Sequence, residues 1–207
     1  MENSIKRASL LIELEQRDRK ELAQRYHFGE EDYQKIDSIY EALQPLMEAE
    51  VCYRIWPEIQ KGKRAALCVV TLGAGIDAMQ EIYTQAGELL QVYILECLGS
   101  VMLEKAYEQI ERILYDETNL HVAKYQFPGT DATLGQVREL LQEMAIRMED
   151  MPVSCNGACM MNPKKSVVYI AGLEKDKKAA CICDTCTRQD CTHRREKKRL
   201  IDYFHIA

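Results

Sequence analysis

The chain has 207 residues, enough to bury the core of one large domain or two small ones. An apolar fraction of 47% and a charged fraction of 29% are typical of a globular protein and exclude a disordered chain. The formal net charge of −6 argues against general nucleic-acid binding.

The amino-terminal segment does not have the pattern of a signal peptide, because the short apolar run Leu10-Leu11-Ile12 is followed directly by Glu13. No stretch of the sequence is long and apolar enough to predict a transmembrane helix. We therefore expect a cytoplasmic protein. In a reducing compartment, cysteines serve as metal ligands or redox thiols more often than as structural disulfides.

The first part of the chain is predicted to contain two helices and a strand. Residues 5–26 carry apolar residues at helical spacing among many charges, which predicts a solvated surface helix. Residues 30–47 repeat the pattern and predict a helix packed on the core. Residues 51–56 alternate between apolar and polar and predict a strand that Pro57 ends.

A second strand is predicted over residues 65–72, which form a continuous apolar run of the kind found in buried strands. Gly73 and Gly75 follow and lead into a helix near Ile76. A single Gly-x-Gly can cradle a phosphate, but the third glycine of the dinucleotide fingerprint is missing. The pattern therefore favours a plain strand-to-helix turn.

Residues 89–114 have the strongest helical periodicity and predict a central buried helix. Gly99 lies inside this helix, where glycine costs about 1 kcal/mol relative to alanine, so we expect another segment to pack closely there. Glu96 and Glu104 lie beside the apolar stripe, and their residue type alone places both at the solvent edge.

The remaining elements are a strand over 121–127, a turn over 128–131, a helix over 134–148 and a strand over 167–172. Strands and helices mix without regular βαβ alternation, which predicts an α+β fold with helices covering one mixed or antiparallel sheet. We divide the chain into an amino-terminal helical extension (1–28), a main domain (29–175) and a cysteine-rich tail (176–207).

The tail concentrates four cysteines in one short polar segment with the spacing C-x-C-x2-C-x4-C: Cys181, Cys183, Cys186 and Cys191. Packing does not explain them, because a buried cysteine behaves as a small hydrophobic residue and would be interleaved with apolar neighbours. Thiolates gathered on a polar loop predict a soft metal site.

Three interpretations of the tail remain open. Compact spacing suits an iron–sulfur cluster held by one loop, and four thiolates also suit a structural zinc site, although only one C-x2-C knuckle (Cys183 and Cys186) is present. The third interpretation is free thiols, or disulfides formed during purification. Cys155 and Cys159 would add a ligand if their loop closed over the tail, and His193 is a possible substitute ligand whose simpler interpretation is a solvent-facing side chain.

Several segments, taken in order, resemble the reactivation domain of cobalamin-dependent methionine synthase, and more closely its stand-alone relatives with a short cysteine-rich tail. The matching pieces are Val51-Cys-Tyr-Arg-Ile-Trp56, Val69-Val-Thr-Leu-Gly73, Ile94-Leu-Glu-Cys-Leu-Gly99-Ser100, Phe127-Pro128-Gly129, Met160-Met-Asn-Pro163-Lys-Lys-Ser166-Val-Val-Tyr-Ile-Ala-Gly172 and Cys183-x2-Cys186-x4-Cys191-x2-Arg194. They run from about Tyr33 to Arg195, most of the chain.

The resemblance implies a single curved domain around a twisted, mostly antiparallel sheet. It also implies an accessory factor that binds S-adenosylmethionine in a shallow groove and docks onto a corrinoid protein, which carries the cobalamin. The implied activity is at most a reductive methylation that returns the corrinoid from Co(II) to methylcobalamin. The implied partner is a corrinoid methyltransferase or a methionine synthase that lacks its own activation domain.

The family loop that binds S-adenosylmethionine reads Arg-x-Ser/Ala-Pro-Gly-Tyr, and this chain matches it only in part. Tyr125 stands at the arginine position and Thr130 at the tyrosine position, while Pro128 and Gly129 are kept. A phenol cannot replace an arginine fork that grips a carboxylate through two hydrogen bonds.

Two further residues complete the predicted binding set. Lys124 can supply a positive charge, although adjacent side chains in a strand face opposite sides. Glu104 lies near a family helix whose carboxylate faces the amino group of the cofactor. The predicted set is therefore Glu104, Lys124, Tyr125, Pro128, Gly129 and Thr130.

These observations leave three hypotheses for function. The first is a reactivation factor for a corrinoid protein. The second, suggested by the missing arginine and tyrosine, is a metal-bearing electron-transfer or interaction module that has lost S-adenosylmethionine binding. The third is a zinc-stabilised binding domain, which would unfold when the metal is removed. No histidine lies in a context that suggests nucleophilic catalysis.

Overall fold

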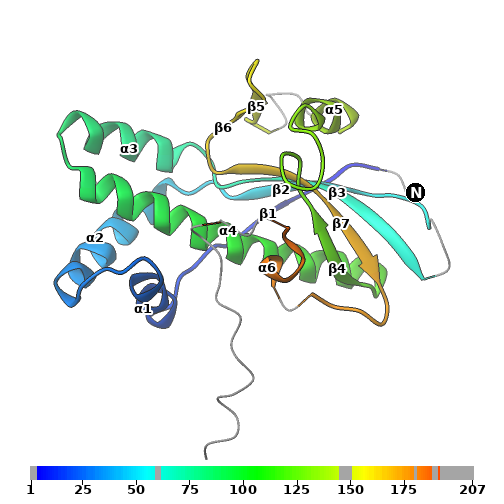
Figure 1. The fold of residues 1–207 in the computed structure, drawn as a ribbon, viewed down its shortest axis with the longest axis horizontal. Helices are drawn as coiled ribbons and strands as arrows, with labels where there is room; N and C mark the ends of the chain where they lie inside the picture. Colours follow the sequence, from blue (N-terminus) through cyan, green and yellow to red (C-terminus); the bar gives the residue numbers. More distant parts are fainter. Residues whose placement is uncertain (1–3, 59–61, 145–150, 180, 188–190, 192–207) are drawn as a thin grey trace, which may run out of the picture.

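The structure, a computed structural model, describes residues 4–58, 62–144, 151–179, 181–187 and 191. It is an α+β domain built on one antiparallel sheet of five strands in the order β1-β2-β3-β7-β4 (Figure 1). The strands are β1 (Lys6–Ser9), β2 (Glu50–Ile55), β3 (Lys63–Thr71), β4 (His121–Gln126) and β7 (Ser166–Glu174). The predicted fold class is confirmed.

The middle of the sheet is buried on both faces, which explains its apolar sequence. In β3, every residue from Ala65 to Thr71 is buried, and β3 pairs with β7 along its whole length. Strands covered on both faces have continuous apolar runs, whereas strands covered on one face alternate. The central position of β3 thus explains the continuous apolar run from which the strand was predicted.

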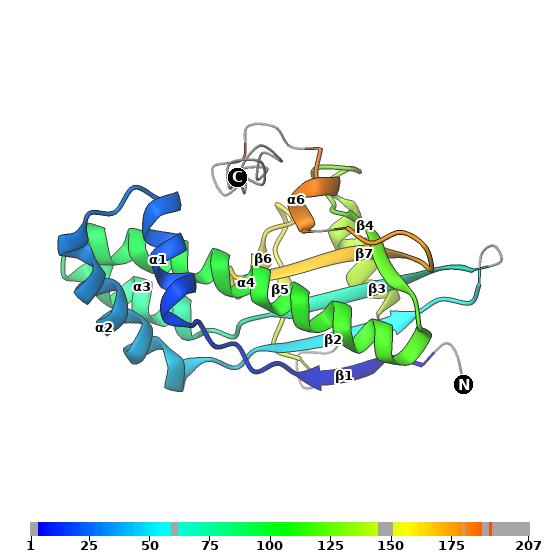
Figure 2. The ribbon, with the colours of Figure 1, turned by 90° about the horizontal axis from the view of Figure 1, so that it is seen from below.

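Helices cover the first face of the sheet, and the longest of them, α4 (Leu89–Thr118), lies along it (Figure 2). At 1.5 Å per residue a helix of 30 residues is about 45 Å long. It therefore extends past the sheet, where it packs with other helices. These are α1 (Gln16–Arg25), α2 (Tyr33–Leu43) and α3 (Gly75–Gln85), with the short 3-10 helices η1 (Glu30–Asp32) and η2 (Gln44–Leu46) beside α2.

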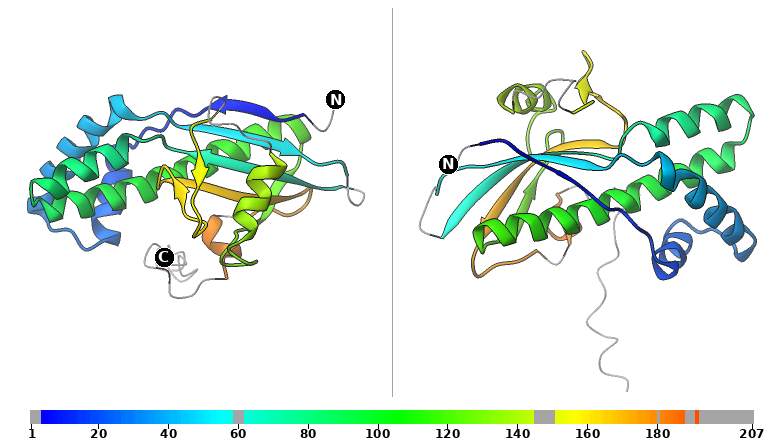
Figure 3. Two further views of the ribbon diagram at one scale, coloured as in Figure 1. Left: turned by 90° about the horizontal axis from the view of Figure 1, so that it is seen from above. Right: turned by 180° about the vertical axis from the view of Figure 1, so that it is seen from behind.

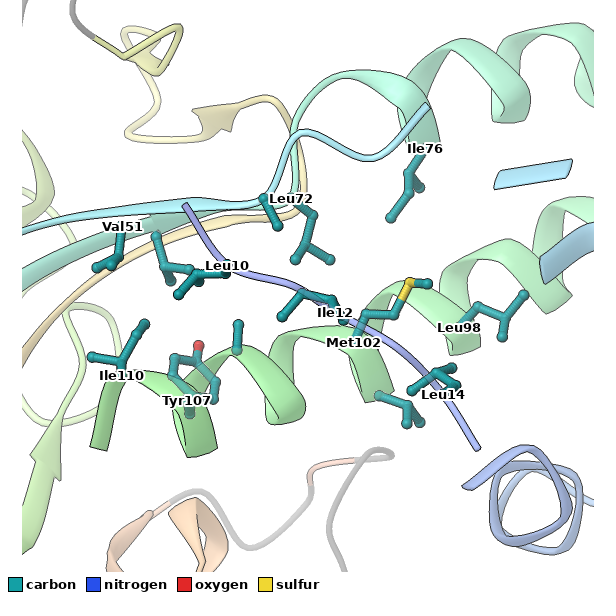
Figure 4. Close-up of a cluster of buried hydrophobic side chains, with 14 of the residues drawn as sticks. Leu10, Ile12, Leu14, Val51, Leu72, Ile76, Leu98, Met102, Tyr107 and Ile110 are labelled. Atoms are coloured by element: carbon teal, nitrogen blue, oxygen red, sulfur yellow. The ribbon is translucent and has the colours of Figure 1, made fainter. Parts of the chain in front are cut away.

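The main core lies between α4 and the sheet, and Figure 4 shows side chains from the amino-terminal segment, β2 and α4 meeting there. Gly99 is part of this packing. A Cβ atom at position 99 would lie 2.7 Å from Cε of Lys165, so the close approach expected at this glycine is confirmed.

A second, smaller core covers the opposite face of the sheet. It is formed by α5 (Gln136–Glu143), by the loop after it, and by the hairpin of β5 (Ser154–Cys155) and β6 (Met161–Asn162). The left panel of Figure 3 shows α5 and this hairpin lying across the sheet on the side away from α4.

One prediction was wrong, that of a helix over residues 5–26. Only α1, from Gln16 to Arg25, is helical there, while Lys6–Ser9 forms the edge strand β1, paired with β2. Leu10, Ile12 and Leu14 are buried and alternate with exposed residues. A period of two indicates extended chain, and the apolar but exposed Leu11 concealed this period in the sequence.

The other predicted elements lie where the sequence predicts them, apart from ends that differ by a few residues. The short elements β5, β6 and the helix at Ile182–Thr185 lie in segments that the sequence predicted to be loops. The predicted helix over 134–148 is α5, and its last predicted residues lie outside the described part of the chain, as does His193. Across the described residues, no helix is both long enough and apolar enough to cross a lipid bilayer.

Candidate functional site

The candidate site begins on the half of α4 that faces β4. Glu104, Glu108 and Glu111 follow each other at helical spacing and lie with Tyr107 on one side of the helix. Glu104 is paired with Arg25 of α1 at 2.8 Å between Oε1 and Nη1. The expectation of a solvent-edge position was wrong for Glu104, whose side chain is only 11% exposed. It is confirmed for Glu96, whose side chain is 42% exposed and pairs with the buried Lys165 at 2.5 Å.

The strand β4 places Tyr125 against this acidic side of α4. Tyr125 is buried, and its hydroxyl donates to Oε1 of Glu111 at 2.5 Å. Its ring packs with Tyr107, Phe127 and Tyr169 at centroid distances of 5.7 to 6.1 Å. Burial, and then the hydrogen bond to Glu111, raise the pKa of Tyr125 well above its ordinary value. The neighbouring Lys124 is exposed, as the alternation of a strand requires.

The turn after β4 is held by backbone hydrogen bonds and by the carboxylate of Asp131. Oδ2 of Asp131 accepts a hydrogen bond from the Phe127 backbone N–H at 2.9 Å, and the Asp131 N–H donates back to the Phe127 carbonyl at 2.9 Å. Gly129 is exposed at the tip with a φ of +82°, a conformation that favours glycine. Pro128 and Thr130 flank it and are half-buried. The predicted loop is thus a rigid turn with an accessible glycine backbone.

The segment after β7 returns along the outer edge of β4. The Ala179 N–H donates to the Val122 carbonyl at 2.9 Å, and the Tyr125 N–H donates to Oγ1 of Thr185 at 3.2 Å. Thr185 ends the short helix α6 (Ile182–Thr185), which lies beside β4 in Figures 1 and 2. Thr187 then donates to Oδ1 of Asp131 at 3.3 Å. The cysteine segment therefore covers the edge of the predicted binding strand.

A small cavity of about 30 Å³ remains where these pieces meet. It is lined by Glu104, Tyr107, Glu108, Glu111, Tyr125, Cys181 and Ile182. The structure thus brings two residues predicted to bind the cofactor, Glu104 and Tyr125, together with one predicted metal ligand, Cys181. Pockets for drug-sized ligands have volumes of roughly 300–1,000 Å³, so this cavity admits such a ligand only if α6 moves.

The predicted metal ligands are less well assembled. Cys181, Cys183, Cys186 and Cys191 are all described and half-buried, yet among the described residues no three histidine, cysteine or acidic side chains converge as a metal site requires. The arrangement does not fit a closed four-thiolate centre, and we derive no step through a metal. The metal site stays a prediction of the sequence.

The structure contradicts the idea that Cys155 and Cys159 close over the tail. Both pack against the second core, with α5 and the β5–β6 hairpin, whereas Ile182 of the tail packs against the main core. Because the sheet separates these two cores, the two groups of cysteines lie on opposite faces.

Sequence reasoning missed several residues of this site, among them Arg25, Glu108, Glu111, Asp131 and Thr185. The spacing of Glu104, Glu108 and Glu111 on one helix face is a signal that could have indicated Glu111. Asp131 follows Pro-Gly-Thr in a predicted turn, where aspartate often caps backbone N–H groups. The contacts of Arg25 and Thr185 depend on segments far apart in sequence and leave no local signal.

Comparison with known proteins supports the fold. A crystal structure titled as the MetH reactivation domain bound to AdoHcy superimposes with a TM-score of 0.60 over 88% of this chain and 83% of that chain, at 9% sequence identity. At this identity the similarity concerns the fold alone. No protein-family model matches the sequence, and no curated protein matches it.

Proposed function

We propose that this protein is an accessory factor that binds S-adenosylmethionine between α4 and the outer edge of β4 and supports the reductive methylation of a corrinoid protein. The observation that carries the proposal is the shared fold with a reactivation domain that was crystallised with AdoHcy. The sequence pieces that resemble that family support the same assignment, because Phe127-Pro128-Gly129 forms the turn beside the cavity.

The charge distribution supports a cationic ligand. S-adenosylmethionine carries a sulfonium and an ammonium group, and three carboxylates of α4 line the cavity. Arg25 pairs with Glu104, Nζ of Lys105 lies 3.9 Å from Oε2 of Glu108, and the hydroxyl of Tyr125 donates to Glu111. Partly buried carboxylates attract a cation more strongly than carboxylates in water do, because the surrounding dielectric constant is lower.

In this proposal, the carboxylate of S-adenosylmethionine is bound less firmly than its sulfonium and ammonium groups. The ligand carboxylate has no arginine fork at position 125, and Lys124 extends from the face of β4 opposite Tyr125. The half-buried Thr130 and the exposed backbone of Gly129 are the residues of the turn that the ligand carboxylate would contact in this proposal. We therefore expect weaker binding than a bidentate arginine would give.

Binding also requires α6 to move, because the cavity beneath Cys181 and Ile182 is too small for the ligand. The Tyr125–Thr185 hydrogen bond is one contact that holds α6 in place. In the proposed reaction, a one-electron donor outside this chain would first reduce the partner's Co(II) to Co(I). The S–CH3 bond of the ligand would then break, the methyl group would pass to Co(I) to give methyl-Co(III), and S-adenosylhomocysteine would leave. The chain's own residues bind and orient the sulfonium and keep water from it.

The test is equilibrium dialysis of labelled S-adenosylmethionine against the full chain and three variants. Thr185→Ala should bind more tightly, because it loosens α6, and Glu108→Gln should bind several-fold more weakly, because it removes a cavity carboxylate. Glu139→Gln, the same change at an exposed site on α5, should match the wild type. If neither the wild type nor Thr185→Ala binds, the proposal is wrong.

The second candidate function is an electron-transfer or interaction module that no longer uses S-adenosylmethionine. The burial of Tyr125 at the family's arginine position favours it. A visible spectrum with elemental analysis of anaerobically purified protein separates the candidates. Charge-transfer absorption with no S-adenosylmethionine binding supports the module, and a colourless, zinc-containing protein that unfolds with chelator supports a zinc-stabilised binding domain.

A further inference from the structure

The β5–β6 hairpin carries two cysteines, Cys155 and Cys159, whose side chains pack against the same core cluster. Cys155 ends β5, and Cys159 lies in the turn that leads to β6, with three residues between them. The Cys155 thiol donates to the Asn156 carbonyl at 3.5 Å, and the nearby Cys159 thiol contributes to raising the pKa of Cys155. Both are half-buried, so reagents in solution can reach them, in contrast to the buried Cys52, Cys68 and Cys97.

The turn that carries the two thiols is fixed by Asn156. Its side-chain Oδ1 accepts hydrogen bonds from the N–H groups of Ala158 at 2.9 Å and Met160 at 3.0 Å. Its backbone carbonyl accepts from the Cys159 N–H at 3.0 Å, and its N–H donates to the Met160 carbonyl at 3.0 Å. The turn therefore returns the chain with Cys159 close to Cys155 before any bond forms between them.

The helix α5 anchors the same turn. Nη2 of Arg138 donates to the backbone carbonyls of Asn156 at 3.4 Å and Gly157 at 3.3 Å. Its positive charge also lies close enough to Cys155 to favour the thiolate, although burial and the Cys159 thiol outweigh it and raise the pKa of Cys155. Thiolate is the reactive form of cysteine, so Arg138 partly offsets the effect of burial on the reactivity of Cys155.

The backbone conformation of Cys159 suggests that a thiol, rather than the turn shape alone, is needed at this position. Its φ is +60°, a left-handed conformation that costs an L-residue about 1 kcal/mol or more and that glycine adopts freely. If the turn needed only its shape, glycine would serve better at position 159. A cysteine at this position instead places its thiol near Cys155.

From this geometry we infer that Cys155 and Cys159 form a redox-active dithiol, which closes reversibly to a disulfide by exchange with a low-molecular-weight disulfide such as oxidised glutathione. The Cys155 thiolate attacks one sulfur of that disulfide, forming a mixed disulfide and releasing one glutathione thiolate. Cys159, after losing its proton, attacks the Cys155 sulfur and releases the second glutathione. Two electrons pass from the dithiol to glutathione.

The inference is independent of the proposed function, because the hairpin lies on the face of the sheet opposite α6. It differs from the metal site predicted for the tail, since two thiols in a short turn suit a disulfide and do not make up a four-thiolate centre. Preorganisation should make closure within the hairpin faster than capture of a second glutathione, by on the order of tenfold or more.

The test is to incubate the full chain in glutathione redox buffers, quench with an alkylating agent and identify disulfides in peptides by mass spectrometry. An intramolecular 155–159 disulfide that dithiothreitol reverses is the expected product. Cys159→Gly, which keeps the left-handed turn without strain, should instead accumulate glutathione on Cys155. Replacing Cys181, Cys183, Cys186 and Cys191 with serine should leave the 155–159 product unchanged.

Three results would overturn the inference. In the first, both thiols stay reduced, or each carries its own glutathione, in buffers that oxidise the tail. In the second, Cys155 or Cys159 is found joined to a tail cysteine. In the third, the pair is recovered holding a metal ion and resists the oxidant. Serine at the buried Cys52 serves as the matched control and should not alter the products.

Discussion

The two half-buried groups of cysteines in this protein differ in what brings them together. Cys155 and Cys159 belong to one five-residue turn, in which backbone hydrogen bonds and the Asn156 side chain bring the chain back on itself. The tail segment containing Cys181, by contrast, takes its position from contacts with β4 and with the turn after it. Local chain geometry therefore holds the first group, and tertiary contacts hold the second.

This difference suggests that the two groups respond to different perturbations. Changes in β4, α4 or the turn at 127–132 should release the tail and leave the hairpin intact. Substitutions at Asn156 or Arg138 should instead loosen the hairpin turn and leave the tail in place. The predictions that follow test this separation, beginning with the largest expected effect.

The largest effect is expected from Tyr125→Ala, which removes a buried ring beneath the tail. Loss of a buried aromatic side chain costs about 3–5 kcal/mol, measured as the free energy of unfolding in urea. The reactivity of Cys181 toward an alkylating agent should rise, whereas that of Cys155 should not. Lys124→Ala, on the exposed side of the same strand, should change stability by less than about 0.5 kcal/mol. Equal losses for both variants would contradict the packing described.

Gly129→Ala should cost about 1–2 kcal/mol, because φ at this position is +82° and an added Cβ would lie 3.1 Å from Cδ1 of Leu134. Gly135→Ala provides the matched control, since nothing lies within 4 Å of a Cβ there and its φ is −56°. The control should be neutral or slightly stabilising. Thermal unfolding of the two variants measures the difference.

Alkaline pH should destabilise the protein through Cys68, a buried cysteine that belongs to neither of the two half-buried groups. Burial raises the pKa of Cys68 from an ordinary value of 9.0 to about 12. The unfolded chain therefore loses this proton first, and stability falls as pH rises from 9 toward 12. Between pH 8 and pH 10, this thiol should lower the free energy of unfolding by about 1.4 kcal/mol. Cys68→Ala should remove this contribution from the pH dependence of stability. An unchanged profile in the variant would contradict the assignment.

The smallest effect is expected from Thr185→Ala, which removes the hydroxyl that accepts the Tyr125 N–H. One hydrogen bond of this kind contributes about 1 kcal/mol. Alkylation of Cys181 and Cys186 should become faster, with no change at Cys155 and Cys159. Asn156→Ala is the reciprocal variant and should speed alkylation of Cys159 alone. If either variant affects both groups equally, the two sites are coupled through the sheet.

The sequence alone determined the periodic parts of the fold. Continuous apolar runs gave β3, and broad helical stripes gave α2 and α4, because burial on one or both sides leaves a period that local reading detects. It also indicated the turn at Pro128 and Gly129 and the resemblance to a reactivation domain, whose fold the structural comparison supports. It failed at Lys6–Ser9, where charged residues concealed an edge strand.

Only the tertiary structure decided which distant residues meet. The sequence placed Glu104 at the solvent edge and gave Tyr125 no partner, whereas the fold pairs the first with Arg25 and the second with Glu111. The tertiary structure also places Cys155 and Cys159 on the face of the sheet opposite the cysteines of the tail. Such pairings depend on how helices and strands pack across long sequence separations, and a local pattern of residues carries no information about that packing.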